Sequence, residues 1–496
     1  MNNAVNSSAS LTGHALARAI AAGDMSAGEA LDACIARVEA TDARVNAFTG
    51  KHYARARCKA AEVDAMRSRG DALPALAGVP YAVKNLFDVQ GDVTLAGSKI
   101  NRSNLPATQD AFLVTQMEAA GAVLVGSLNM DEYAYGFTTE NTHYGPCHNP
   151  HDLSRIAGGS SGGSGAAVAA GQVPITLGSD TNGSIRVPAS LCGVWGLKPT
   201  FGRLSRRGSY PFVHSIDHLG PLADSVESLA LAYDALQSPH PLDPGCHAMN
   251  IEPVASTLAQ REQGFDGSRV GLRVGLLGGY FHDNATPPAR EVAGLAAKIL
   301  CAVDVVHGDV GSDLGSDVRS DVEWPDAALA RAAAFIITAS EGGSLHLPDL
   351  RTRLQDFEPL SADRFVAGAL QPVAWYLRAQ RFRRLYRDRV SELFKYWDIL
   401  LAPATPVSAT IIGTEWLDIN GTQHPCRAAM GLLTQPISFA GCPVVAAPMW
   451  PAGTGGMPIA VQIIAAPWRE DLAFRAAQVL SDAGVAHLGH LRHSPL

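Results

Sequence analysis

A stretch rich in glycine and serine constrains the fold of this chain more than any other feature. Residues 158–190 read GGSSGGSGAAVAAGQVPITLGSDTNGSIRVPAS, with six serines, eight glycines, and neither histidine nor cysteine. A flexible linker does not fit, because ordered apolar sequence follows the first glycines directly. A phosphate-binding loop does not fit either, because no Gly-Lys-Ser/Thr ending is present. If one of these serines is a nucleophile, a group outside the stretch must accept its proton.

The stretch allows two arrangements of a nucleophilic serine. Gly158, Ser160 and Gly162 match G-x-S-x-G, the pattern of a nucleophile elbow, but an elbow follows an apolar strand and Ser160 follows SRIAGG. We favour an arrangement with two serines. In it the loop 158–164 opens a helix, and the turn DTNGS (180–184) places Ser184 where backbone N–H groups converge.

Lys84 is the candidate base. It stands alone in the apolar run VPYAVKNLFDV (79–89), where burial would disfavour the ammonium and lower the pKa of the amine. In a second interpretation Lys84 ends a strand and forms an ion pair with Asp88 or Asp131. The local sequence leaves both interpretations open.

Strand-like and helix-like segments alternate along most of the chain. Two amphipathic helical patterns occupy residues 11–67, and short apolar runs then alternate with helical segments. Strand-like runs resume in the second half, at DILLAPATPV (398–407), GCPVVAAPMW and GMPIAVQIIAAP. We expect an α/β fold, an α/β/α sandwich in which helices cover both faces of a large twisted mixed sheet.

No linker-like composition separates the two groups of strands, so we expect residues 1–496 to form a single domain. Its expected parts are a helical layer (1–67), a core with the Gly/Ser stretch (68–237), a variable segment (238–326), and the second half of the sheet with one side of the pocket (327–496). The acidic stretch GDVGSDLGSDVRSDVEWPD (308–326) predicts a solvated loop.

Charge and cysteine content exclude several functional classes. The net charge of −8 gives no basic field for nucleic acid. One arginine-rich run, QRFRRLYRDR (380–389), has apolar residues at helical spacing and predicts a solvated helix face rather than a polyanion site.

The eight cysteines show no metal-ligand spacing, so we expect free thiols and no metal. Without a signal peptide or a membrane-length apolar segment, we expect a cytoplasmic protein with no membrane partner.

The region from Gly158 to Thr200 resembles the signature of the amidase signature family, and VPYAVKNLFDV, GSLNMDEYAYG and TPVSATI are similar to its flanking blocks. The resemblance extends over about residues 10–485. It implies the fold described above, no cofactor, and a Ser-cisSer-Lys triad. The triad would comprise Ser184 as nucleophile, Ser160 as bridging serine and Lys84 as base.

The resemblance also implies an oxyanion hole, formed by the backbone N–H groups of Thr181, Asn182, Gly183 and Ser184. Asn182 stands where a glycine is common in the family, so its side chain is available to face a substrate. Among the other polar residues, we expect Asp180 and Arg186 to hold the loop.

The segments DTNGSIRVPASLCG, SYPFVHSIDHLGP and AVQIIAAPWREDLA are most similar to a biuret-type amidohydrolase branch of the family. Arg364 matches the arginine with which the family's glutamine-hydrolysing subunits bind a carboxylate. Their acidic residue, which binds the substrate's ammonium, corresponds to Gly431. A carboxylate could therefore be held, whereas a cationic amine would lack a partner.

The resemblance therefore implies an amidohydrolase that releases ammonia from a small anionic amide, either 1-carboxybiuret or a biuret-like compound. Two alternatives remain: the glutamine-hydrolysing subunit of a tRNA-dependent amidotransferase, and an amidase for other small amides or aryl amides. The expected partner is a small helical accessory subunit, and a homo-oligomer is a further expectation. The candidate substrate contacts are Arg364, Asn182, Ser161 and His218, and for His218 the alternative, which we favour, is a buried structural histidine. We expect Ser179 and Ser190 only to pack.

Overall fold

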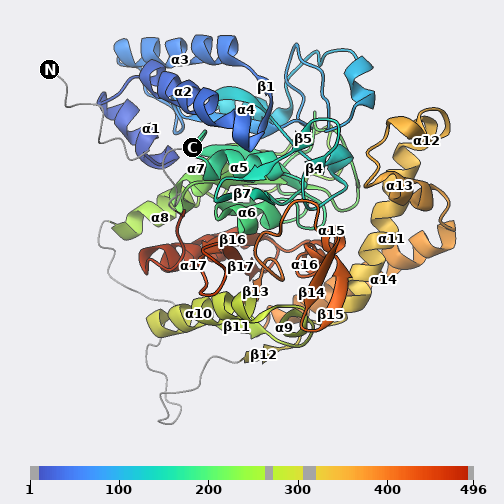
Figure 1. Cartoon of the computed structure of the whole chain (residues 1–496). Coiled ribbons are helices and arrows are strands. Elements are labelled where there is room, and N and C mark those ends of the chain that lie inside the picture. The colour runs from blue at the N-terminus through green and yellow to red at the C-terminus, as the bar shows by residue number, and fades with distance from the viewer. Residues whose placement is uncertain (1–10, 263–271, 305–319, 490–496) are drawn as a thin grey trace.

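An 11-stranded sheet forms the centre of the molecule (Figure 1). The computed structural model describes residues 11–262, 272–304 and 320–489. The order of strands across the sheet is β1-β3-β2-β8-β10-β9-β16-β17-β13-β11-β12. These strands are β1 (Phe48–Lys51), β2 (Pro80–Lys84), β3 (Val123–Leu128), β8 (Ile175–Asp180), β9 (Trp195–Lys198), β10 (His218–Ala223), β11 (Val274–Leu277), β12 (Ser320–Val322), β13 (Ile399–Pro403), β16 (Val444–Met449) and β17 (Ile459–Ala465).

The sheet is mixed. β2 is parallel to β3 and to β8, and β11 is parallel to β12 and to β13, whereas the remaining neighbours are antiparallel. Every residue of β2, β8, β16 and β17 is buried. Strands covered on both faces read as continuous apolar runs in a sequence, which is why their positions were visible there.

Successive residues of β2 point into two different hydrophobic cores. Tyr81 and Val83 belong to one core, and Ala82 belongs to the other. One face carries α2 (Ala27–Val45), α3 (Tyr53–Ser68), α5 (Gly162–Ala169) and α6 (Arg186–Cys192). The opposite face carries α4 (Phe112–Ala119), α7 (Val226–Leu236), α10 (Pro287–Asp304) and α17 (Glu470–Asp482). The predicted α/β fold with a helix-covered mixed sheet is confirmed.

A separate group of helices lies beside the sheet, on the right of Figure 1. It contains α11 (Ala327–Leu345), α12 (Leu347–Thr352), α13 (Ala362–Ala369) and α14 (Val373–Leu393), with α16 (Gln435–Ala440) packed against α11 and α14. The shorter helices elsewhere are α1 (Gly13–Ala22), α8 (Ala255–Glu262), α9 (Gly279–Asp283) and α15 (Cys426–Ala429). Three two-stranded ribbons complete the structure: β4 (Glu140–Asn141) with β5 (Gly145–Pro146), β6 (His148–Asn149) with β7 (Asp152–Ile156), and β14 (Trp416–Ile419) with β15 (Thr422–Pro425).

The sheet runs through both halves of the chain, because β9 from the first half pairs with β16 from the second. The segment 238–326, expected to be variable, supplies α10, the edge strand β12 and its neighbour β11. Up to residue 319, the acidic stretch that begins at 308 lies outside the described residues, and its predicted loop stays a prediction there. The prediction is wrong at the described end of the stretch, because Ser320–Val322 pair with β11 as β12 and Trp324 is buried.

Other sequence expectations concern metals, thiols and membranes. In the described ranges no group of three or more His, Cys, Asp or Glu side chains could hold a metal ion. Seven cysteines are free thiols: Cys34, Cys58, Cys147, Cys192, Cys246, Cys426 and Cys442. Among the helices that the structure describes, none is long and apolar enough to cross a membrane.

Candidate active site

Lys84 lies at the end of β2 and is completely buried. Its Nζ atom donates hydrogen bonds to Oγ of Ser160 at 2.7 Å and to Oγ of Ser179 at 2.8 Å. Burial lowers the pKa of Lys84 to about 7, and the nearby charges of Asp131, Asp180 and Asp217 only partly oppose that shift. Lys84 forms no ion pair with any described residue, so the interpretation in which it pairs with an aspartate is not realised.

Ser160 lies in the loop between β7 and α5, and the Gly159–Ser160 peptide bond is cis. The carbonyl of Ser160 accepts a hydrogen bond from the N–H of Asp131 at 3.3 Å, and the N–H of Ser161 donates to the carbonyl of Ser184 at 3.3 Å. These contacts place the Gly/Ser loop against the turn that carries Ser184.

A buried ion pair closes the turn between β8 and α6. Arg186 donates from Nε to Oδ2 of Asp180 at 3.0 Å and from Nη2 to Oδ1 at 2.9 Å. The N–H of Ile185 donates to the same carboxylate at 3.2 Å, and Nη1 of Arg186 reaches Gln462 on β17 at 2.6 Å. Although burial opposes ionisation of Asp180, the Arg186 guanidinium holds the pKa of that carboxyl well below its usual range. The expectation that Asp180 and Arg186 hold the loop is confirmed.

Inside this turn, four consecutive backbone N–H groups are available. The N–H groups of residues 181–184 donate to no acceptor within the described parts of the chain. Gly183 has φ 139°, and a Cβ atom there would lie 2.1 Å from Oγ1 of Thr434, so only glycine fits. The hydroxyl of Thr434 donates to the carbonyl of Asn182 at 2.7 Å, which fixes the peptide group before Gly183. Converging N–H groups of this kind can stabilise a developing negative charge.

A small pocket opens next to Ser184. One wall comes from the loop 134–137 and the turn that carries Ser184, and the other comes from α11 and α13. Among the described residues that line it, Arg364 alone is ionic, and its guanidinium lies 5.5 Å from the ring centroid of Tyr135. The lining residues are Ala134, Tyr135, Gly136, Phe137, Thr181, Asn182, Ser184, Phe212, Phe335, Thr338, Arg364, Ala428 and Gln435.

Asn182 lines this pocket and carries an unused acceptor. Its Nδ2 donates to Oγ1 of Thr338 on α11 at 3.0 Å. Its Oδ1 is buried and has no hydrogen-bond partner among the described residues. A buried amide oxygen without a partner carries a desolvation cost, which a donor on a bound molecule would relieve.

Gly431 leaves no room for an acidic side chain. A Cβ atom at this position would lie 2.5 Å from Cζ and 2.6 Å from Cε2 of Phe137, whose ring is buried and lines the pocket. The space that a carboxylate would need is therefore filled by an aromatic ring.

Two candidate substrate contacts do not reach the pocket. His218 is buried on β10, where Nδ1 bonds to the carbonyl of Asp180 at 3.0 Å and the ring packs edge-on against Phe201. Burial holds the pKa of His218 well below its usual range. Ser161 donates from Oγ to the carbonyl of Ser179 at 3.2 Å, beneath the turn. Both side chains therefore contact backbone carbonyls of β8, and neither lines the pocket next to Ser184.

Sequence reasoning missed the role of Ser179, which was expected only to pack. Its hydroxyl accepts a hydrogen bond from Lys84 because β2 and β8 are parallel neighbours whose carboxyl ends meet at one edge. Polar residues at the ends of two apolar runs were the available signal. The pairing of those runs was not visible in the sequence.

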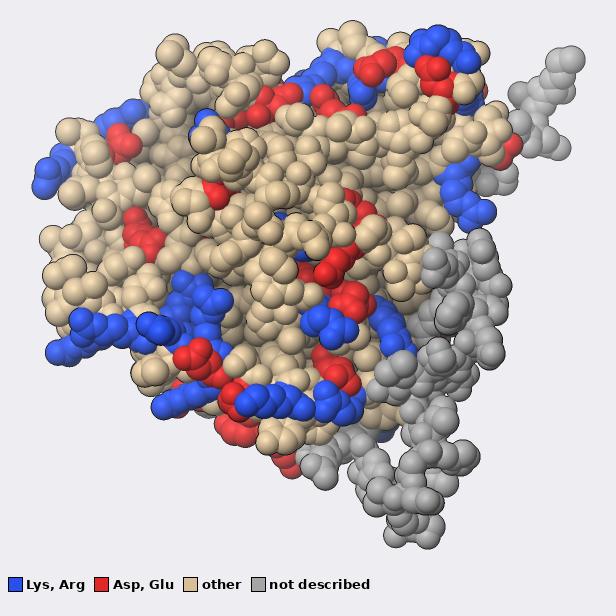
Figure 2. Space-filling model, turned by 180° about the vertical axis from the view of Figure 1, so that it is seen from behind, with Lys and Arg blue, Asp and Glu red and all other residues tan. Residues whose placement is uncertain are grey.

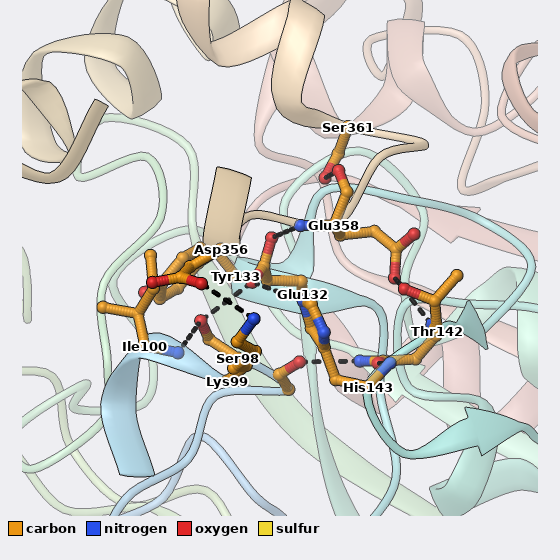
Figure 3. A network of polar contacts seen from close by, with 12 residues as sticks. Ser98, Lys99, Ile100, Glu132, Tyr133, Thr142, His143, Asp356, Glu358 and Ser361 are labelled. Atoms are coloured by element: carbon orange, nitrogen blue, oxygen red, sulfur yellow. Dashed lines mark hydrogen bonds and ion pairs between the residues drawn. The ribbon is translucent and has the colours of Figure 1, made fainter. Parts of the chain in front are cut away.

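Sequence reasoning also missed a buried network that holds the segment before Arg364 (Figure 3). The carboxylate of Glu132 accepts a hydrogen bond from the N–H of Glu358 at 2.7 Å and another from Ser98 Oγ at 2.8 Å. The carboxylate of Glu358 accepts from the N–H of Thr142 at 2.7 Å. Glu132 and Thr142 flank the loop that lines the pocket, so the network links that loop to the segment that leads into α13.

Comparisons with known proteins agree with this geometry. A family model described as "Amidase" matches residues 29–474. AtzE, a 1-carboxybiuret hydrolase component from Pseudomonas sp. (strain ADP), is 66% identical over 469 residues, which are 95% of this chain and 98% of that protein. A glutamyl-tRNA(Gln) amidotransferase component from Anaeromyxobacter sp. (strain K) is 38% identical, over 93% of this chain and 94% of that protein.

Solved structures also match nearly the whole length of this chain. A structure described as "An unexpected vestigial protein complex reveals the evolutionary origins of an s-triazine catabolic enzyme" matches with a TM-score of 0.91 and 64% identity, over 97% of this chain and 100% of the other. The 6-aminohexanoate cyclic dimer hydrolase complexed with substrate matches with a TM-score of 0.81 and 30% identity, over 98% of each chain. The family model and these relatives span nearly the whole sequence, and the chain therefore belongs to the amidase family.

Proposed function

We propose that this protein is an amidohydrolase that acts through Ser184, Ser160 and Lys84. The observation that carries the proposal is the 2.7 Å contact between Nζ of Lys84 and Oγ of Ser160, made by a buried amine whose pKa is lowered to about 7. A lysine with this pKa is partly neutral near pH 7 and can act as a base.

In the proposed reaction, neutral Lys84 accepts the proton of Ser160 while Ser160 accepts the proton of Ser184. Oγ of Ser184 bonds to the amide carbon, and the oxyanion that forms is stabilised by the N–H groups of residues 181–184. The protons return through Ser160 to the leaving nitrogen as the C–N bond breaks, which releases ammonia. Water then attacks the acyl-enzyme by the same relay, and the acid product leaves with Ser184 restored.

We propose a small anionic amide as the substrate, and 1-carboxybiuret as the specific compound. Arg364 would bind the carboxylate, since a guanidinium offers paired donors to its two oxygens. The free Oδ1 of Asn182 would accept an N–H of the substrate. Phe137 fills the place beside Gly431 where an acidic side chain would bind an α-amine. The similarity to the 1-carboxybiuret hydrolase component supports the same substrate class.

A small helical accessory subunit is the proposed partner. One similar solved structure is described as a vestigial protein complex, which supports assembly with a second chain. We also propose that the chain itself forms a homo-oligomer.

The second candidate function is glutamine hydrolysis within a tRNA-dependent amidotransferase, as suggested by relatives 38% identical. The Phe137 ring beside Gly431 favours the first function, because the ammonium of glutamine would be buried without a partner.

The test is an ammonia-release assay on the purified protein, with and without a candidate accessory subunit. The substrates are 1-carboxybiuret, biuret, malonamate, glutamine and an aryl amide. We expect turnover of 1-carboxybiuret that falls by about 10⁴-fold or more in Ser184→Ala and Lys84→Ala. Undiminished turnover in both variants would exclude the triad. Efficient glutamine hydrolysis without 1-carboxybiuret turnover would establish the second function instead.

A further inference from the structure

A second pocket, of about 430 Å³, lies between α14 and the segments that carry Ala440, Cys442 and Pro467. It shares no lining residue with the pocket that contains Ser184. Three arginines of α14 line it, namely Arg383, Arg384 and Arg387, together with the neutral side chains of Gln380 and Ser391. In the view from behind, Lys and Arg side chains gather at the lower left (Figure 2), on the side of the molecule where Figure 1 places the helices α11–α14.

Arg383 forms the floor of this pocket and is 6% exposed. Its guanidinium donates only to neutral carbonyls, those of Phe439 and Ser215, and its Nη2 has no hydrogen-bond partner among the described residues. Burial and the charge of Arg387 lower the pKa of Arg383 to about 10, which leaves the side chain charged at neutral pH. A buried cation with an unused donor costs free energy that a bound anion would offset.

The two arginines at the rim are exposed and also lack partners. Neither Arg384 nor Arg387 forms an ion pair within the described residues, whereas Arg389 on the same helix pairs with Asp326. Three guanidinium groups therefore line one pocket, and none of them forms an ion pair with a carboxylate of the described residues.

The carboxylates near these arginines do not balance them. Asp388 is the one carboxylate among the residues that line the pocket. Glu341 of α11 acts on Arg383 electrostatically, but its oxygens already accept hydrogen bonds from Ser215 and Tyr376. The pocket retains an excess of positive charge.

We propose that this pocket binds a phosphate-type oxyanion, either free phosphate or the phosphate group of a small metabolite. Arg384 and Arg387 would bind the oxygens with paired N–H groups, and Arg383 would supply a fixed charge beneath them. A phosphate fits better than a carboxylate, because three guanidinium groups offer more donors than two oxygens can accept. The remaining volume, beside Pro467 and Ala440, has room for an organic group. The run 380–389 forms part of α14 with most of its arginines exposed, which confirms the predicted solvated helix face, and the proposal adds an anion site to this face.

The test is isothermal titration calorimetry in a phosphate-free buffer, with inorganic phosphate and glycerol 3-phosphate as probes. An Arg364→Ala background removes anion binding in the other pocket. We expect binding of at least one probe that weakens by about tenfold or more in Arg384→Gln and in Arg387→Gln. Whichever probe binds more tightly identifies free phosphate or a phosphate ester as the ligand type.

The matched control is Arg381→Gln, an exposed arginine of α14 that does not line the pocket. We expect this variant to bind the probes as the Arg364→Ala parent does. Absence of binding, equal weakening in the control, or binding that persists in both rim variants would overturn the proposal. Circular dichroism of every variant verifies that the fold is retained.

Discussion

Lys84 donates a hydrogen bond to Ser179 at 2.8 Å, across 95 residues of sequence. This contact determines the direction in which the lone pair of the neutral amine points. A neutral amine has two N–H bonds and one lone pair, so an N–H donated to Ser179 leaves the lone pair free to face Ser160, 2.7 Å away. Ser179 is therefore a positioning residue in the proposed relay.

Replacement of Ser179 tests this orientation. In Ser179→Ala the amine loses one of its two partners, and we expect kcat to fall by about 10- to 100-fold while KM changes by less than about threefold. Ser179→Thr keeps the hydroxyl and should recover most of the activity. Steady-state kinetics on 1-carboxybiuret measure kcat and KM of each variant. An unchanged kcat in Ser179→Ala would show that the contact is dispensable.

The pH dependence of the reaction follows from the pKa of Lys84. The relay needs the neutral amine, so activity should be low below the pKa and should rise through about pH 7 to a plateau above it. Asp131 raises this pKa through its charge. The rising limb of kcat/KM should therefore move to lower pH in Asp131→Asn, measured between pH 5 and 9, and a shift to higher pH would contradict the assignment.

Arg364 should separate anionic from neutral substrates. Arg364→Ala removes the only charged side chain that lines the pocket among the described residues. We expect kcat/KM for 1-carboxybiuret to fall by about 10²- to 10³-fold, which corresponds to about 3–4 kcal/mol, while kcat/KM for biuret changes little. Equal losses on both amides would indicate a general disturbance of the pocket instead of a lost charge contact.

Gly431 and Phe137 should be energetically coupled. Gly431→Ala forces a Cβ atom against the Phe137 ring, and we expect the free energy of unfolding to fall by about 1–3 kcal/mol. In the double variant with Phe137→Ala the clash is absent, so the added cost of Gly431→Ala should nearly vanish. Urea unfolding of the two single variants and the double variant measures this coupling, and strictly additive losses would rule it out.

The sequence predicted the central strands because their residues are buried on both faces, and the family resemblance pointed to Lys84, Ser160 and Ser184. It could not predict which side chain of β8 contacts Lys84, because strand pairing decides that contact. Ser179 was expected only to pack, yet its hydroxyl meets Lys84, whereas His218 packs against Phe201 and does not line the pocket. The hydrogen bond from the N–H of Glu358 to the carboxylate of Glu132 spans 226 residues, so no local pattern indicated it.

The two walls of the pocket next to Ser184 differ in origin. The base and the turn with free N–H groups belong to β2, β8 and α6, whereas Phe335, Thr338 and Arg364 belong to α11 and α13, which lie beside the sheet. The proposed carboxylate-binding arginine therefore lies in a different part of the chain from the proposed triad. Exchange of residues 327–370 between members of the family is a direct route to altered substrate choice, because it would leave the hydrolytic machinery in its original scaffold.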